Sequence, residues 1–272
     1  MTEPEVLRLE VAGGQSIVLD WYPAHARAPV VLYIHGLGSD RRGEKARYFA
    51  RQFSAAGRAL AALDLRGHGD SDGELRELTM SGLLADVDVA AAWTAARSAT
   101  GRLLLIGASM GASVAAWYAA RRPALTEALI LIAPAMRFPA ALAATPAGET
   151  AERWRSEGEL RVRSEWIDVT LGRALLDDAA RYDPDVLPLE LRTPALLIHG
   201  FHDSVIPWEQ SADFVRACAR WRAGAPPATD LILISDGDHR LTAHKELLFA
   251  LMCAWLERRA PATAGATQPL RG

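Results

Sequence analysis

Residues 102–122 read RLLLIGASMGASVAAWYAARR. The apolar run at 103–106 is bounded by glycine and is too short for a buried helix, so it predicts a buried strand. The segment from Ala112 is rich in good helix formers and predicts a helix. Between them, residues 107–111 match G-x-S-x-G, which is typical of a strained turn from a strand into a helix. Small residues let the strand and helix approach closely, so this turn would lift the Ser109 hydroxyl above the sheet edge.

Strands and helices alternate along almost the whole chain. Two half-exposed strands at 6–11 and 16–21 flank a Gly-Gly pair and predict an antiparallel hairpin. Apolar runs predict buried strands at 30–34, 103–106 and 129–132. Further strands are predicted at 59–63, 195–198 and 231–234. Helices are predicted at 44–56, 79–97, from 112 onward, 208–221 and 243–259. This alternation predicts an α/β fold, with a mostly parallel sheet and helices on both of its faces.

One long segment, 134–187, interrupts the alternation with prolines and many charged residues. We interpret it as a small helical cap insertion over the C-terminal edge of the sheet. Residues 1–133 and 188–259 then form the core. The last residues, 260–272, are rich in Ala, Pro, Thr and Gly and predict a flexible tail.

Composition narrows the class of protein. Half of the 272 residues are hydrophobic, which is enough for a large core and argues against disorder. A net charge of -3 favours neither nucleic acid nor an anionic membrane as a partner. Cys218 and Cys253 both fall in predicted helices, so we interpret them as small core residues rather than a disulfide framework.

The expected location of the protein rests on two kinds of segment that the sequence does not show, a signal peptide and a membrane span. The N-terminal sequence has no basic region followed by an apolar stretch, so we expect no signal peptide. No apolar span is long enough to cross a bilayer. We therefore expect a soluble, cytoplasmic protein.

Two later loops supply the partners that a reactive serine needs. A serine hydroxyl is a weak nucleophile unless a histidine takes its proton, and an acid must orient that histidine. Asp203 follows the strand at 195–198, and His239 follows the strand at 231–234. The order Ser109, Asp203, His239 is the one expected when a serine on such a turn uses an acid and a base from later strands.

Other histidines and acids compete for these roles. His202 neighbours Asp203 and is the principal rival base. Asp236 and Asp238 are rival acids, but we interpret them as turn and N-cap residues. His35 and His199 each end a strand before a glycine, and we expect them to hold loop backbone by hydrogen bonding. Structural or exposed positions are expected for His25, His68 and His244.

Two backbone amides are candidates to stabilise negative charge on a substrate oxygen. The Met110 N–H lies at the predicted helix N-terminus, where such charge is favoured. The Leu37 N–H lies between glycines in the loop after the strand at 30–34. We expect no metal, because His35, His68, His202 and His239 lack Cys partners and helical ligand spacing. We also expect no cofactor, because Gly36-Leu37-Gly38 lacks the third glycine of a dinucleotide-binding turn.

Several short motifs together resemble the α/β-hydrolase superfamily over residues 5–258. They are His35-Gly36, Asp64 with Gly69-Asp70-Ser71, the GASMG turn, His199-Gly200 with Asp203 and Ile206-Pro207, and Gly237-Asp238-His239. Within the superfamily the chain is similar to the serine-aminopeptidase-like and abhydrolase groups, which include carboxylesterases, monoacylglycerol lipases and acyl-protein thioesterases. The resemblance implies Ser109 as nucleophile, His239 as base, Asp203 as acid, and the Leu37 and Met110 amides as oxyanion hole.

The sequence therefore predicts a serine hydrolase that cleaves small-molecule carboxylic esters or thioesters through an acyl-enzyme. An aminopeptidase or amidase is the alternative, in which a carboxylate would bind the amino terminus of the substrate. Candidates for that carboxylate are Glu152, Glu157, Glu159 and Glu165, although they also fit solvated cap helices. Trp154 and Trp166 would line an acyl pocket or pack the cap onto the sheet. A non-catalytic binding protein on this fold is the third reading. Substrate-binding residues, acyl length and oligomeric state are not indicated.

Overall fold

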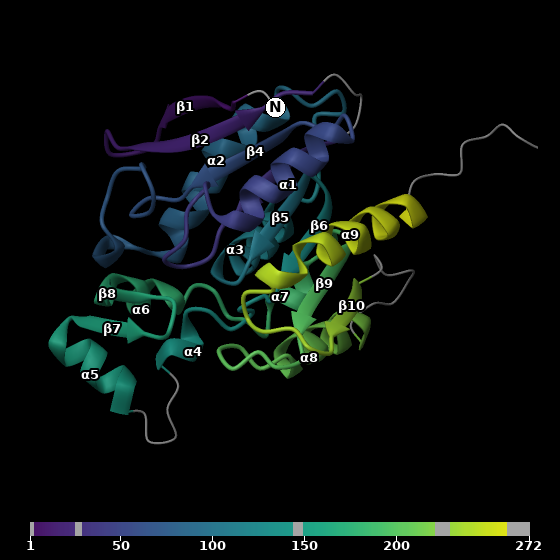
Figure 1. Ribbon diagram of the computed structural model, residues 1–272. Coiled ribbons are helices and arrows are strands. Elements are labelled where there is room, and N and C mark those ends of the chain that lie inside the picture. Colours follow the sequence, from purple (N-terminus) through teal and green to yellow (C-terminus); the bar gives the residue numbers. More distant parts are fainter. Residues whose placement is uncertain (1–2, 25–28, 144–148, 221–228, 260–272) are drawn as a thin grey trace, which may run out of the picture.

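The computed structural model describes residues 3–24, 29–143, 149–220 and 229–259 (Figure 1). The expectations for the tail at 260–272, for His25 and for the helix end at Trp221 lie outside the described residues.

An eight-stranded sheet runs through the centre of the molecule in the order β1-β2-β4-β3-β5-β6-β9-β10. Its strands are β1 (Glu5–Glu10), β2 (Ser16–Tyr22), β3 (Val30–Ile34), β4 (Leu60–Asp64), β5 (Leu103–Ala108), β6 (Thr126–Ile132), β9 (Ala195–Gly200) and β10 (Thr229–Ile234). β2 pairs antiparallel with β1 and with β4, and the other neighbouring strands are parallel. The predicted α/β fold with a mostly parallel sheet is confirmed.

Helices cover both faces of this sheet, because each central strand is apolar on both sides. They are α1 (Glu44–Ala55), α2 (Met80–Ala95), α3 (Met110–Arg121), α8 (Glu209–Arg220) and α9 (Lys245–Arg259), with short 3₁₀ turns η1 (Leu75–Glu77) and η2 (Thr242–His244). Val31 and Tyr33 belong to the core cluster with α1 and α9. Leu32 and Ile34 belong to the cluster with α2, α3 and α8, as the two-residue period of a strand requires. Helix α3 begins two residues earlier than the expected Ala112.

The segment at 134–187 is mixed rather than wholly helical. It contains the helices α4 (Ala140–Ala143), α5 (Glu149–Glu157) and α6 (Arg173–Ala179) and the strands β7 (Glu159–Arg163) and β8 (Asp168–Gly172), and the short helix α7 (Leu187–Glu190) overlaps its end. β7 and β8 form a separate antiparallel two-stranded sheet, which the sequence interpretation did not anticipate. Figure 1 shows α4, α5, α6 and this hairpin grouped together at one end of the large sheet.

Candidate active site

Ser109 occupies the strained turn that the sequence predicts between β5 and α3. Its backbone has φ 51° and ψ −117°, a region that non-glycine residues rarely adopt. A Cβ at Gly107 would lie 2.5 Å from the Cα of Ala112, and one at Gly111 would collide with the carbonyl of His35. Only glycine therefore fits at positions 107 and 111, and this explains both glycines of the G-x-S-x-G motif.

Strand register brings the distant loops of the predicted site together. Ile34 on β3 pairs with Gly107 on β5, so the loop after β3 emerges beside Ser109. Ile234 on β10 pairs with Gly200 on β9, so the loops that carry Asp203 and His239 are also neighbours. All four strands are parallel, and their carboxyl ends meet at one edge of the sheet.

Ser109, His239 and Asp203 form a continuous chain of hydrogen bonds. The Ser109 Oγ lies 3.1 Å from His239 Nε2, and His239 Nδ1 lies 2.7 Å from Asp203 Oδ2. Asp203 Oδ2 is a carboxylate oxygen and accepts, so Nδ1 carries the hydrogen in neutral His239 and Nε2 is free to accept from the serine hydroxyl. The geometry matches that needed for proton transfer from Ser109 to His239.

The Asp203 carboxylate is buried and is held in the charged form. Its Oδ1 accepts the backbone N–H groups of Val205 at 2.9 Å and Ile206 at 2.8 Å. Burial alone would raise the pKa of Asp203, but hydrogen bonds with His199, His239 and the Ile206 backbone hold that pKa well below its usual range. A charged carboxylate at this position orients the imidazole of His239 and stabilises its protonated form.

His199 also contacts Asp203, a link that sequence reasoning missed. Its Nε2 lies 2.9 Å from Asp203 Oδ2 and 3.1 Å from the Ile206 carbonyl, so it holds loop backbone as expected and binds the carboxylate as well. Its Nδ1 lies 2.7 Å from the hydroxyl of Ser211. Two acceptors at Nε2 place the hydrogen there, and Nδ1 then accepts from Ser211. The available signal was the four-residue spacing of His199 and Asp203 within one loop.

The two predicted amides both line the cavity that contains Ser109. Leu37 lies in the loop after β3, and Met110 is the first residue of α3. A Cβ at Gly36 would lie 3.2 Å from Ser109 Cβ, so this loop abuts the turn. Within the described residues neither amide donates a hydrogen bond, and both donors are free for an oxygen of a bound substrate.

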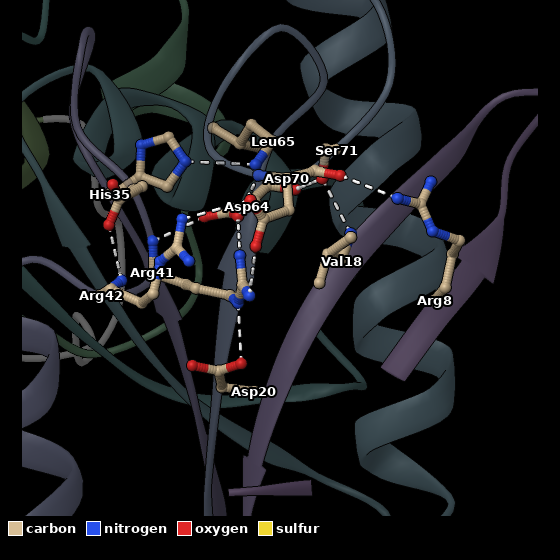
Figure 2. A network of polar contacts seen from close by, with 11 residues as sticks. Arg8, Val18, Asp20, His35, Arg41, Arg42, Asp64, Leu65, Asp70 and Ser71 are labelled. Carbon is tan, nitrogen blue, oxygen red and sulfur yellow. Dashed lines mark hydrogen bonds and ion pairs between the residues drawn. The ribbon is translucent and has the colours of Figure 1, made fainter. Parts of the chain in front are cut away.

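A buried arginine ties the loop after β3 to the sheet (Figure 2). Arg41 Nε lies 2.7 Å from Asp20 and Nη2 lies 2.8 Å from Asp70, while Nη1 contacts Asp64. The Arg41 backbone N–H also donates to Asp64 at 2.6 Å. Burial alone would lower the pKa of Arg41, but these carboxylates raise it above its usual range. Leu37 precedes Arg41 on the same loop. The ion pairs of Arg41 therefore hold the stretch of backbone that carries the Leu37 amide.

His35 gives the same loop a second attachment. Its Nδ1 donates to the Gly36 carbonyl at 2.8 Å, and its Nε2 accepts the Leu65 N–H at 3.1 Å. Burial lowers the pKa of His35 to about 4, and burial together with the nearby His35 lowers the pKa of His68 to about 3. Both imidazoles are therefore neutral at pH 7, and the predicted backbone role of His35 is confirmed.

A cavity of about 500 Å³ opens at Ser109, with walls formed by the core and by the segment at 134–187. Its apolar lining comes from both sides, namely Leu37, Ala108, Met110, Ile132, Ala135, Phe138, Leu142, Val162, Trp166, Ile167, Val205 and Ile206. Trp166 lies on the cavity, whereas Trp154 is fully buried among the core residues. The cavity therefore offers an apolar wall to a substrate whose carbonyl sits at Ser109.

The rival bases and acids lie apart from this chain of hydrogen bonds. His202 is exposed and packs edge-on against Phe201. Asp236 pairs with His244 at 3.0 Å, and Asp238 accepts the Leu241 N–H at 2.6 Å, as expected for turn residues. Of the four glutamates considered for an amino-terminal pocket, only Glu165 lines the cavity; the others are exposed residues, namely Glu152, Glu157 and Glu159.

No group of three or more His, Cys, Asp or Glu side chains in the described ranges is placed to hold a metal ion. No helix there is both long and apolar enough to cross a membrane.

Comparison with known proteins identifies the family. A family model described as serine aminopeptidase, S33, matches residues 25–165, just over half of the chain. The protein belongs to this family, and its resemblance to the α/β-hydrolase superfamily is confirmed.

Two relatives are named for a hydrolase activity. The mitochondrial palmitoyl-protein thioesterase ABHD10 of Mus musculus is 28% identical over 244 residues, which cover 84% of this chain and 74% of the relative. A monoacylglycerol lipase of Mycolicibacterium smegmatis is 34% identical over 128 residues, which cover 46% of this chain and 44% of the lipase.

Solved structures establish the fold. Mouse alpha/beta hydrolase domain-containing protein 10 matches with a TM-score of 0.78 and 24% identity, covering 94% of this chain and all of that one (100%). Est1E from Butyrivibrio proteoclasticus, solved with ferulic acid, matches with a TM-score of 0.79 and 20% identity, covering 94% and 100% of the two chains. The chain thus has the α/β-hydrolase fold.

Proposed function

We propose that the protein hydrolyses carboxylic esters or thioesters through an acyl-enzyme intermediate. Ser109 is the nucleophile, His239 the general base and Asp203 the acid that orients it. The observation that carries the proposal is the chain of hydrogen bonds from Ser109 through His239 to the buried Asp203, at the edge of an apolar cavity. The thioesterase and lipase names of the relatives support the same class of reaction.

Acylation begins when Ser109 Oγ attacks the carbonyl carbon and its proton moves to His239 Nε2. The carbonyl oxygen becomes an oxyanion, which accepts hydrogen bonds from the Leu37 and Met110 amides. Collapse of this intermediate breaks the bond to the leaving oxygen or sulfur, and protonated His239 gives its proton to the leaving group. Asp203 stabilises the imidazolium while it carries that proton.

Deacylation repeats these steps with water as the nucleophile. His239 takes a proton from the water, which attacks the acyl carbon held on Ser109 Oγ. The second tetrahedral intermediate uses the same two amides. Its collapse returns the proton from His239 to Ser109 and releases the carboxylic acid, so that the enzyme is regenerated without a cofactor.

An acyl group of low polarity is the substrate part that suits the cavity. Twelve apolar residues line it, including Phe138 and Trp166 from the segment at 134–187. An aminopeptidase would need an anionic subsite for the charged amino terminus of its substrate. The acids on the lining are Glu165 and Glu44, which pairs with Lys245, and the lining also carries Lys45 and Arg240. It is therefore no anionic subsite, and ester and thioester hydrolysis is the better supported function.

The proposal extends to the organisation of the chain. Residues 1–133 and 188–259 form the catalytic core, and 134–187 form the cap that shapes the acyl site. The relative in mouse is named as mitochondrial, and the cytoplasmic location expected for this chain stays a prediction.

Hydrolysis of p-nitrophenyl esters from acetate to laurate tests the proposal. We expect Ser109→Ala to lower kcat by about three orders of magnitude or more, because the nucleophile is lost. Ser113→Ala is the matched control. Ser113 lies one turn further along α3, is fully buried and makes no hydrogen bond through its hydroxyl, so this variant retains activity. Wild-type turnover that survives Ser109→Ala would contradict the proposal.

A further inference from the structure

One end of the cavity is basic, and the proposed chemistry does not use it. We define this basic end as Tyr33 on β3, Lys45 on α1 and Arg240 in the loop after β10, all of which line the cavity with Ser109. Lys45 and Arg240 lie far apart in the sequence, but the Lys45 ammonium donates a hydrogen bond to the Arg240 carbonyl. Two cations therefore share one wall of the cavity.

Neither cation is neutralised by the protein. Within the described residues, no carboxylate lies within 4.0 Å of Lys45 or Arg240, although most other buried or half-buried cations near the site have such a partner. The nearest acids are engaged elsewhere. Glu44 pairs with Lys245 at 3.0 Å, and Asp238 accepts a backbone N–H at 2.6 Å. Glu44 and Asp238 act on Lys45 from beyond 4.0 Å and offset only part of its charge. A wall that keeps positive charge favours an anionic ligand.

The electrostatic surroundings of Lys45 also favour an anionic ligand. Burial and the positive charge of Arg240 lower the pKa of Lys45 to about 8. The ammonium form still predominates at pH 7, and a bound anion would restore its pKa toward the ordinary value. An anion placed between the two cations would therefore relieve both their repulsion and the desolvation of Lys45.

Tyr33 supplies an independent, neutral donor. Its side chain is only 3% exposed and packs against Phe49, yet its hydroxyl makes no hydrogen bond to any described residue. Burial raises the pKa of Tyr33 above its usual range, so the hydroxyl keeps its hydrogen. A buried donor without a partner, on the lining of a cavity, is suited to an acceptor that arrives with a ligand.

The N-terminus of α1 adds main-chain donors at the same place. Gly43, Glu44 and Lys45 all line the cavity, and the N-cap residue Gly43 makes no side-chain capping bond. The first amides of a helix have no intrahelical acceptor, and the helix dipole there favours negative charge. Side-chain and main-chain donors thus lie on the lining of the same cavity.

We propose that the basic end binds a carboxylate or phosphate on the leaving group of the substrate. The side is set by His239, because the leaving oxygen or sulfur must receive its proton from Nε2, and Arg240 follows His239 directly in the chain. The inference rests on the proposed hydrolase function and names its substrate class: acyl esters or thioesters of anionic alcohols or thiols. The acyl group then occupies the apolar lining under the segment at 134–187.

Binding of three matched hexanoyl esters to the Ser109→Ala chain tests the proposal by isothermal titration calorimetry. The esters are those of para-hydroxybenzoate, of its uncharged methyl ester, and of para-hydroxyphenyl phosphate. We expect both anionic esters to bind about tenfold more tightly than the methyl ester, because they gain charge-assisted hydrogen bonds. The tighter of the two anionic esters identifies whether carboxylate or phosphate is preferred.

Variants assign the preference to the basic end. In the Ser109→Ala background, Lys45→Met should bring the affinities of charged and uncharged esters to within about twofold, whereas Lys45→Arg keeps most of the difference. Arg240→Gln removes an exposed side chain that has no hydrogen bond or ion pair with any described residue, so it tests the same site without threatening the fold. Arg51→Met is the matched control: Arg51 is exposed on α1 and lies outside the cavity, and its removal should leave the difference intact.

Two results would overturn this inference. One is equal affinity for the charged and uncharged esters in the Ser109→Ala chain, and the other is a charge preference that survives Lys45→Met. Failure of the proposed function is a separate outcome. It would show as an absence of turnover of any of the three esters by the wild-type chain, while the charge preference in binding, which needs no turnover, would still support the basic end.

Discussion

The two walls of the cavity are held in different ways. On the core side, the loop after β3 is fixed by Arg41, whose side chain is 4% exposed and whose guanidinium contacts three carboxylates. On the cap side, the β7–β8 hairpin carries the pair Arg161–Asp168, whose side chains are 65% and 42% exposed. Buried charges impose one geometry because leaving them unpaired is costly, whereas exposed pairs contribute little. The wall on the core side is therefore fixed by buried charge, whereas the exposed pair on the β7–β8 hairpin contributes little to holding the other wall.

The largest effect is expected from replacing Asp203, the acid on the core side of the site. Asp203→Asn should lower kcat by about three to four orders of magnitude, because an amide can no longer hold His239 in the productive tautomer. Steady-state kinetics on p-nitrophenyl butyrate would measure it. Asp236→Asn is the control, since Asp236 is an exposed acid that pairs with His244 and, within the described residues, makes no hydrogen bond or ion pair with His239. A similar kcat in both variants would refute the role of Asp203.

A direct comparison of the two walls comes from equivalent substitutions of their arginines. Arg41→Met should lower the free energy of unfolding by about 3–5 kcal/mol, because it leaves buried carboxylates unpaired. Arg161→Met should lower it by less than about 1 kcal/mol, because its pair is solvated. Urea unfolding followed by circular dichroism would give both values. Equal losses would remove the distinction drawn between the walls.

A smaller effect is expected from pH. His35 has a pKa of about 4 in the folded protein and an ordinary value of 6.5 when unfolded, so the unfolded state binds more protons between these limits. Stability from His35 is therefore present above pH 6.5 and is lost as the pH falls toward 4. Between pH 7 and pH 5 the loss should be on the order of 1–2 kcal/mol. Urea unfolding at both pH values should show a smaller loss in His35→Gln than in wild type; an unchanged loss would exclude His35 as the source.

Much of the fold and the centre of the site could be predicted from sequence because the signals are local. The apolar run at 103–106 and the GASMG turn after it indicate a buried strand and a strained serine within ten residues. Asp203 follows the buried strand β9 and His239 follows the half-exposed edge strand β10, and the parallel arrangement of those strands brings their ends together. Such signals depend on neighbouring residues and on one rule of sheet topology.

The remaining features depend on contacts between distant residues. Arg41 meets Asp20 and Asp64 only because β2 and β4 lie side by side, and no local pattern marks these residues as partners. The bond from Lys45 to Arg240 joins residues 195 positions apart. β7 and β8 are five-residue strands that pair with each other. Charged and apolar residues alternate in β7 (ELRVR), as in a half-exposed strand, but no local pattern shows which segment it pairs with.

Labelling with a fluorophosphonate, followed by mass spectrometry of the digested protein, tests most directly whether Ser109 is an activated nucleophile. We expect one covalent adduct on the peptide that contains Ser109, present in wild type and in Ser113→Ala and absent from Ser109→Ala. Lack of labelling in the folded wild-type chain, together with no turnover of any ester, would contradict the account and favour a ligand-binding protein on this fold. An adduct that persists in Ser109→Ala would contradict it by placing the reactive group elsewhere.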